Sequence, residues 1–238
     1  MFVWADMGEL QQNEKRFRKL YGDKLHKKAI QKKAGTAMKV IGITGGVGSG
    51  KSEILSYIRD HYPCQIVLAD DLAKRLQEPG QACYEPLITL LGSDIVGEDG
   101  RILKPVMADK IFGDSELLEK INALIHPAVV AEILRLRDLA EKNEKIQLFF
   151  VEAALLIENG FDKICDEMWY IYAEESIRRE RLKASRGYSE EKITAIMAKQ
   201  LPESEFRKNC QVVIDNSASL PESIRQIDQV LEAYQWQK

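Results

Sequence analysis

The sequence of 238 residues has no long hydrophobic run. No stretch approaches the ~18 consecutive apolar residues of a membrane-spanning helix. The segment from Met1 to Asp6 also lacks an apolar core of the length that a secretory signal needs. We therefore expect neither a membrane partner nor a signal for export.

Cysteine is scarce as well. The four residues are widely separated, at Cys64, Cys83, Cys165 and Cys210. No two of them form a C-x-x-C pair and none lies in a Cys/His cluster, so the pattern indicates neither a zinc site nor a disulfide framework. We expect reduced thiols and a cytoplasmic protein.

Basic residues are fewer than acidic residues over most of the chain. Residues 38–238 carry 25 Lys/Arg against 33 Asp/Glu, a balance of −8 that is not typical of a nucleic-acid-binding protein. Residues 1–37 carry nine Lys/Arg against four Asp/Glu, a balance of +5. We interpret residues 1–37 as a basic N-terminal extension outside the folded core; a basic arm for nucleic acid is the alternative.

The strongest feature that is present is the motif G-x-x-x-x-G-K-[ST]. Its residues are Gly45, Gly46, Val47, Gly48, Ser49, Gly50, Lys51 and Ser52. Successive backbone N–H groups in such a P-loop form a concave anion site, and the N-terminus of the following helix adds its positive dipole end. Lys51 can reach the β- and γ-phosphates of a nucleotide, and the Ser52 hydroxyl can bind Mg²⁺.

The context of the motif supports nucleotide binding. The β-branched run 38–44 before it is suited to a buried parallel strand. After it, Ile54, Leu55 and Ile58 are spaced as on one face of a helix. Strand, glycine-rich loop and helix is the order that this chemistry requires.

Strand and helix patterns alternate through the rest of the chain. Further strands are expected at 65–70, 146–152, 168–172 and 212–214. Five strands that alternate with helices predict a three-layer α/β fold with a parallel sheet. Ligands bind at the carboxyl ends of such strands, where the P-loop, Asp70 and Glu152 would all lie. One helix is expected to end near His126-Pro127, with another following to Asn143. Ser189, followed by Glu190 and Glu191, is expected to cap a helix that runs to about Leu201 and stops at Pro202.

Kinases, GTPases and motor ATPases all share the P-loop. The N-K-x-D signature of GTPases is absent, no glutamine-bearing D-x-x-G switch follows a strand, and helicase motifs are missing. Two classes stay open on these residues. One is a small-molecule kinase, whose acceptor could be a nucleoside or nucleotide. The other is a nucleotide-dependent switch that binds polynucleotides through its basic segment.

Several short segments occur in the order found in the dephospho-CoA kinase family, and from Met38 onward the chain resembles that family of nucleoside-monophosphate-kinase-like P-loop proteins. The segments are Gly42 to Ser52; Ala69-Asp70 with Glu78-Pro79-Gly80; Asp99-Gly100; Ile125-His126-Pro127; Leu155-Leu156-Ile157-Glu158; Arg181-Leu182 with Arg186; and Val213-Ile214-Asp215-Asn216-Ser217. Each segment beyond the P-loop is weak alone, and the ordered set is specific.

The resemblance implies transfer of the ATP γ-phosphoryl group to the ribose 3′-hydroxyl of dephospho-CoA, the last step of CoA synthesis, with Mg²⁺. It implies a kinase domain over 38–238, with a helical acceptor lobe at about 72–142 and a helical lid at about 176–205. The chain departs from the family pattern at a few positions. These are Leu68, Lys74, Ala154, the longer spacing from Arg181 to Arg186, Cys210-Gln211 and Ala218.

Catalytic roles follow from the P-loop and the resemblance together. Lys51 is expected to hold the phosphates. The resemblance places a functional acid at Asp70, the candidate base that orients and deprotonates the acceptor hydroxyl; capping of the next helix is the alternative. Arg186 is the candidate lid arginine at the transferred group, because Gly187 follows it in a turn.

Three binding roles complete the expected site. Ser52 and Glu152 are the candidate Mg²⁺ residues, with Glu152 acting through water; a solvated acid at a strand end is the alternative for Glu152. Asn216 is the candidate contact for the adenine edge, and a turn role is the alternative. The expected co-substrate is ATP and the expected acceptor is dephospho-CoA. We expect a monomer or weak homo-oligomer, with no nucleic acid or membrane partner.

Overall fold

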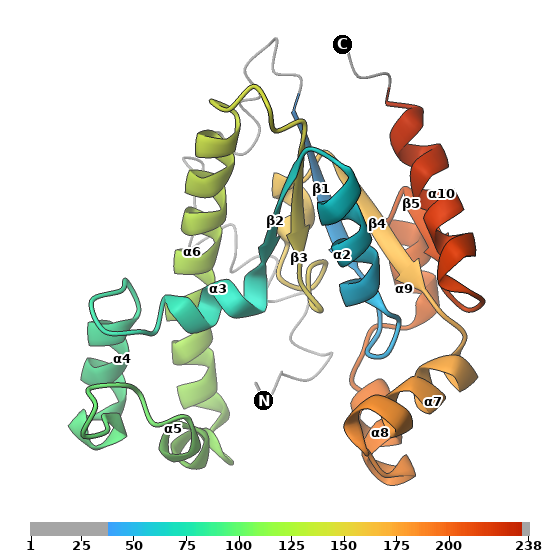
Figure 1. The fold of residues 1–238 in the computed structure, drawn as a ribbon. Helices are drawn as coiled ribbons and strands as arrows, with labels where there is room; N and C mark the ends of the chain where they lie inside the picture. The colour runs from blue at the N-terminus through green and yellow to red at the C-terminus, as the bar shows by residue number, and fades with distance from the viewer. Residues whose placement is uncertain (1–37, 235–238) are drawn as a thin grey trace.

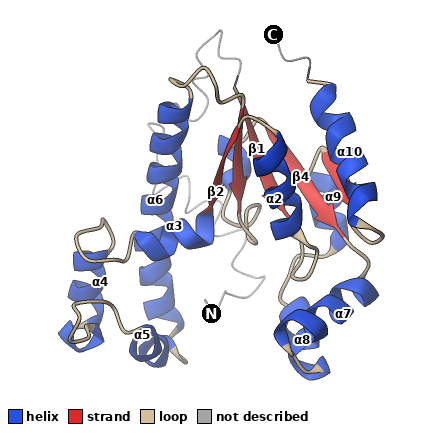
Figure 2. Ribbon diagram, in the orientation of Figure 1, coloured by secondary structure: helices blue, strands red, loops and turns tan. Residues whose placement is uncertain are grey.

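The computed structural model describes residues 38–234, so the predicted N-terminal extension 1–37 lies outside the described residues. Five parallel strands form the central sheet in the order β2-β3-β1-β4-β5 (Figure 1 and Figure 2). They are β1 (Lys39–Thr44), β2 (Cys64–Leu68), β3 (Leu148–Glu152), β4 (Glu167–Tyr172) and β5 (Val212–Asp215). The predicted five-stranded parallel sheet is confirmed.

Helices cover both faces of this sheet. Helices α2 (Lys51–His61) and α10 (Leu220–Glu232) pack on one face. Helices α6 (Ser115–Ala140) and α9 (Glu203–Asn209) pack on the other. Side chains alternate along β1, with Ile41 and Ile43 in the first core and Val40 in the second. A strand buried on both sides needs this continuous apolar sequence.

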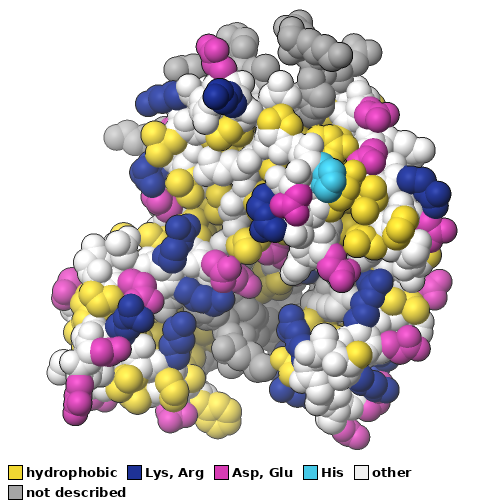
Figure 3. Space-filling model, in the orientation of Figure 1, with side chains coloured by type: hydrophobic (Ala, Val, Ile, Leu, Met, Phe, Trp, Pro, Cys, Tyr) yellow, Lys and Arg dark blue, Asp and Glu magenta, His cyan; other side chains and the backbone are white. Residues whose placement is uncertain are grey.

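Two groups of helices extend beyond the carboxyl ends of the strands. The lobe helices are α3 (Ala69–Arg75), α4 (Tyr84–Leu91) and α5 (Lys104–Ile111), which all contact α6. We refer to α7 (Glu175–Arg186) and α8 (Glu190–Met197) as the lid helices, after the lid that the resemblance implies. Two short 3-10 helices, η2 (Ser93–Ile95) and η3 (Phe161–Ile164), complete the described elements. The lobe helices and the lid helices stand on opposite sides of the sheet's lower edge (Figure 1 and Figure 3).

Helix α6 corrects one prediction from the sequence. The expected break at His126-Pro127 does not occur, and a single helix of 26 residues runs through Pro127. Buried residues spaced four apart, Ile121, Ile125 and Val129, continue one apolar stripe past the proline. Burial of this stripe against the sheet outweighs the cost of about 3 kcal/mol for a proline inside a helix.

Two other boundaries differ from the sequence prediction. Strand β2 ends at Leu68, so Asp70 lies in the first turn of α3 and not at the strand end. The helix expected from Ser189 to about Leu201 ends at Met197, and a separate helix, α9, follows Pro202. The predicted cap at Ser189 is confirmed, because its Oγ accepts a hydrogen bond from Lys192 N.

Between residues 38 and 234, no helix combines the length and the apolar character needed to cross a membrane. All four cysteines are free thiols, two of them buried in the core.

The inward face of α6 generates a stability prediction. Ile133 is buried, so Ile133→Ala is expected to lower the free energy of unfolding by about 2–5 kcal/mol through the cavity it leaves. Leu139 lies on the same helix but is 48% exposed, so Leu139→Ala is expected to change that free energy by no more than about 0.5 kcal/mol. Urea denaturation measures both variants, and equal losses would contradict the assigned face.

Candidate active site

The P-loop takes the strand–loop–helix form that the sequence predicts. It joins β1 to α2, and Gly48 and Gly50 have φ angles of 80° and 87°, a left-handed conformation that favours glycine. A Cβ atom added to Gly50 would collide with the side-chain amide of Asn216. The loop therefore requires glycine both for its backbone angles and for the close approach of its neighbours.

The ammonium group of Lys51 lies close to a backbone oxygen and to a carboxylate. Its Nζ donates a hydrogen bond to Gly45 O at 2.8 Å and lies 3.8 Å from Glu152 Oε1. Glu152 ends β3 beside Ile43 of β1, so the register of the sheet brings the carboxylate to the P-loop. The carboxyl ends of the two parallel strands thus place an ammonium and a carboxylate together, as expected.

Electrostatic shifts show which other groups surround Lys51. Burial lowers the pKa of Lys51, the carboxylates of Glu152 and Asp70 oppose this effect, and the guanidinium groups of Arg178 and Arg186 add to it. Burial also raises the pKa of Glu152, which Lys51 opposes and Asp70 reinforces. Two acids and two lid arginines therefore act on one ammonium group.

Asp70 reaches this neighbourhood from the first turn of α3. Partial desolvation raises the pKa of its carboxyl group, whereas the cations of Lys74 and Lys51 lower it. The N-cap of α3 is Leu68, so Asp70 is not the capping residue. The neighbouring Asp71 accepts a hydrogen bond from Lys74 at 2.6 Å and is exposed.

A cavity opens beside Asp70, between α3, α6 and the segment that follows β3. We refer to it as the α3–α6 cavity. Its polar lining comes from Asp70, Asn122, His126 and Asn159, and apolar side chains such as Val129 and Phe161 form the remaining wall. A ligand that is partly apolar and carries several hydroxyl or amide groups fits such a lining.

Oxygen donors for a metal ion also lie at the loop. Ser52 is in the first turn of α2, and Glu152 approaches from β3. Hydroxyl and carboxylate oxygens are the hard ligands that Mg²⁺ prefers, and this ion takes few protein ligands when phosphates supply others. Accordingly, the described residues contain no group of three or more His, Cys, Asp and Glu side chains placed to hold a metal.

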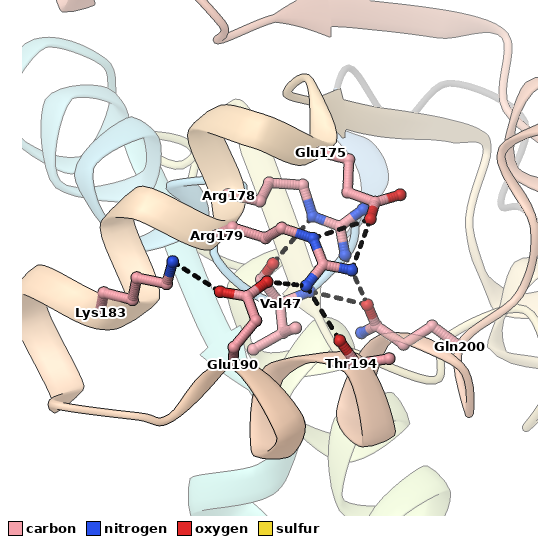
Figure 4. A network of polar contacts seen from close by, with 8 residues as sticks. All are labelled: Val47, Glu175, Arg178, Arg179, Lys183, Glu190, Thr194 and Gln200. Carbon is pink, nitrogen blue, oxygen red and sulfur yellow. Dashed lines mark hydrogen bonds and ion pairs between the residues drawn. The ribbon is translucent and has the colours of Figure 1, made fainter.

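Two arginines of the lid helix α7 contact the P-loop directly, which the sequence interpretation did not expect. Arg178 Nε donates to Val47 O at 2.9 Å (Figure 4). Arg181 donates to Ser49 O at 3.4 Å and to Asn216 O at 2.9 Å. Neither arginine therefore lies on a solvated helix face.

The predicted lid arginine, Arg186, lies at the C-terminal end of α7. Its guanidinium is near the ring of Tyr188, at 5.9 Å from the ring centroid, and it acts on Lys51 electrostatically. Gly187 follows with a φ of 61° and forms the expected turn. The catalytic role of Arg186 stays a prediction.

Asn216 is buried against the P-loop. Its Nδ2 donates to Ser49 O at 2.8 Å, and its Oδ1 accepts from Ser223 Oγ at 2.8 Å. Both ends of the amide therefore bond protein groups and hold the loop to α10. The adenine contact expected of Asn216 stays a prediction.

Comparison with known proteins identifies one family. The sequence profile of the dephospho-CoA kinase family matches residues 39–222. A dephospho-CoA kinase of Carboxydothermus hydrogenoformans is 33% identical over 198 residues, which cover 83% of this chain and 95% of the relative. One of Aquifex aeolicus is 35% identical over 196 residues, which cover 82% and 97%.

Solved structures give the same picture of the fold. The crystal structure of TT1252 from Thermus thermophilus superposes with a TM-score of 0.68 at 32% identity, and the match covers 82% of this chain and 97% of that one. A dephospho-CoA kinase from Campylobacter jejuni has a TM-score of 0.62 at 19% identity, with 81% and 95% covered. At that identity the second likeness bears on the fold alone.

The half-buried histidine of the cavity, His126, generates a prediction about pH. Burial lowers the pKa of His126 from 6.5 to about 4. Between these values the unfolded chain binds a proton that the folded chain does not. The contribution of His126 to stability is therefore complete above about pH 6.5 and is lost as the pH falls through about 4.

We expect the difference in unfolding free energy between the wild type and His126→Asn to shrink by roughly 3 kcal/mol from about pH 7 to about pH 4. Urea denaturation at several pH values measures this difference. Glu158, whose pKa burial raises to about 7, titrates in both proteins and cancels. A difference that does not change with pH would show that His126 is not buried in its neutral form.

Proposed function

The chain belongs to the dephospho-CoA kinase family, and we propose that the residues around its P-loop transfer the γ-phosphoryl group of ATP to the ribose 3′-hydroxyl of dephospho-CoA. The products are CoA and ADP. One observation carries the assignment of residues. Asp70 lines the α3–α6 cavity and also acts electrostatically on Lys51, so it stands between an acceptor site and a phosphate site.

The phosphate site consists of the P-loop and Lys51. Backbone N–H groups from Gly46 to Ser52 and the N-terminus of α2 supply positive charge for the triphosphate. Lys51 binds the β- and γ-phosphates, and each charge-assisted hydrogen bond contributes roughly 1.5–3 kcal/mol. Binding of this kind holds the transferred group in place, which is most of what catalysis of phosphoryl transfer requires.

Ser52 and Glu152 fit the Mg²⁺ ion that accompanies the nucleotide, Ser52 as a direct ligand and Glu152 through water. When bound, this ion neutralises charge on the β- and γ-phosphates. The donor chemistry supports the assignment, because both side chains offer oxygen and approach the loop from α2 and β3.

Asp70 acts on the acceptor. An alcohol in the α3–α6 cavity can donate its proton to the Asp70 carboxylate as its oxygen attacks the γ-phosphorus. The raised pKa of Asp70 makes the carboxylate a better proton acceptor than an aspartate with an ordinary pKa. The polar groups of the same cavity, Asn122, His126 and Asn159, then orient the nucleotide or pantetheine portion of dephospho-CoA.

The lid helices close the phosphate site. We assign Arg186 to the transferred group and Asn216 to the adenine edge, with closure excluding water that would compete as acceptor. We infer a cytoplasmic monomer or weak homo-oligomer with no nucleic acid or membrane partner. The free thiols support the compartment, and the acidic balance of residues 38–238 argues against nucleic acid.

A coupled assay of ADP release tests the reaction. With ATP and Mg²⁺, release is expected to depend on dephospho-CoA. A nucleoside or nucleotide that replaces dephospho-CoA more effectively would shift the assignment to another acceptor. Slow release that needs no acceptor, together with salt-sensitive binding of polynucleotides, would instead indicate a nucleotide-dependent switch.

Asp70 provides the sharpest test of the mechanism. Asp70→Asn is expected to lower kcat by about 10²–10⁴-fold and to leave the KM for ATP nearly unchanged, because the amide cannot accept the proton. Asp71→Asn is the matched control, since Asp71 is the next residue, is exposed and accepts a hydrogen bond from Lys74. Near-normal kcat in Asp70→Asn would remove this residue from the mechanism.

A further inference from the structure

Arg178 covers the first half of the P-loop. Its Nε donates to Val47 O at 2.9 Å, and a Cβ atom added to Gly46 would collide with its guanidinium group (Figure 4). The backbone of α7 at Arg178 also lies close to Gly48, another residue without a side chain. The lid helix and the loop thus meet where only glycine leaves space.

The guanidinium of Arg178 has no ion pair among the described residues, and Glu175 and Glu203 act on it only from farther away. Among residues 38–234, no carboxylate lies within 4.0 Å of its guanidinium, although the side chain is half-buried. Arg179, the next residue, pairs with both Glu175 and Glu190 (Figure 4). A partly buried cation without a counter-ion is unfavourable, so the position of Arg178 favours binding of an anion.

Gln200 fixes the direction of this guanidinium. Its Oε1 accepts from Arg178 Nη2 at 2.7 Å and from Val47 N at 3.1 Å. Arg178 of α7 and Gln200, which follows α8, therefore both bond the backbone of one loop residue, Val47. All the acceptors that Arg178 bonds are neutral, and a phosphate oxygen makes a stronger, charge-assisted bond.

The place of Arg178 along the loop indicates which phosphate it would contact. Lys51 Nζ donates to Gly45 O, and the Arg178 guanidinium lies against Gly46, the next residue of the loop. Ser49 O, farther along the loop, bonds Asn216 and Arg181 instead. Arg178 therefore lies near Lys51, the residue that binds the outer phosphates.

We propose that Arg178 is a further cationic ligand of the terminal phosphate of ATP, in addition to Lys51 and Arg186, and that Gln200 is its positioning residue. This inference rests on the nucleotide site of the proposed function and not on its acceptor. A contact with the terminal phosphate is made by ATP and not by ADP. The pair Arg178–Gln200 therefore determines how strongly the enzyme prefers its co-substrate to its product.

Titration calorimetry of the full chain with Mg-ATP and with Mg-ADP, without acceptor, tests this. Arg178→Met keeps much of the apolar side chain and removes the charge. It is expected to raise the Kd for ATP by about 10–100-fold and the Kd for ADP by less than about threefold. Arg179→Met, the matched control on the same helix, is expected to leave the ratio of the two Kd values unchanged.

Gln200→Leu tests the positioning role. Alone, it is expected to weaken ATP binding by about 3–10-fold. In the Arg178→Met background it is expected to cause no further change in the ratio of the Kd values for ATP and ADP, because the bond of Gln200 to Val47 N affects both nucleotides alike. A merely structural glutamine would give additive losses and would affect ATP and ADP alike. Arg178→Lys keeps the charge without the fork and is expected to bind ATP with intermediate affinity, should Arg178→Met fold poorly.

Equal losses for ATP and ADP in Arg178→Met, or no loss, would overturn the proposal. So would a change in the ratio of Kd values of the same size in Arg179→Met. These outcomes are separate from the acceptor assay. If dephospho-CoA is not phosphorylated but the ratio shifts as expected, the role of Arg178 stands and only the acceptor assignment fails.

Discussion

The Lys51 ammonium, held at the P-loop beside Glu152, is the interaction on which the site depends. A largely buried cation is stable only with partners; Gly45 O and Glu152 contact it, and Asp70 acts on it electrostatically from a third element. Parallel pairing of β1 with β3 fixes Glu152, and the turn from β2 into α3 fixes Asp70. When a triphosphate binds, the positive charge of Lys51 is already in position. This is the preorganisation that phosphoryl transfer requires.

The lid belongs to the same electrostatic arrangement. Helix α7 divides its arginines between two faces: Arg178 and Arg181 bond carbonyl groups at the P-loop, whereas Arg179 pairs with glutamates of the lid itself. Arg178 adds positive charge beside Lys51, Arg181 bonds Ser49 and Asn216, and Arg179 joins α7 to α8. A lid that binds the loop through its cations can respond to the charge of the nucleotide beneath it, since phosphate competes for the same donors.

Local chemistry in the sequence predicted the elements that depend on it. The glycine pattern predicted the loop, the β-branched runs predicted the parallel sheet, and Ser189 with its acidic neighbours predicted a helix start. Tertiary packing decided the rest. A buried stripe carries α6 through Pro127, which no local rule indicates. Arg178 and Arg181 resemble surface residues in the sequence. The one signal that the faces of α7 differ is the spacing of Glu175 and Arg179, four residues apart, which allows these two to pair on the outer face. The cavity beside Asp70 is formed by segments that are distant in sequence, so its polar lining could not be predicted from the sequence.

The central claim is that the Lys51 ammonium holds the phosphates of the nucleotide for transfer. The most direct measurement is kcat/KM for ATP in Lys51→Ala, with the acceptor at saturation and folding checked by circular dichroism. Loss of one preorganised donor of this kind costs about 10²–10³-fold, and we predict a loss of at least that size. A Lys51→Ala protein that is folded and retains wild-type kcat/KM would contradict the account.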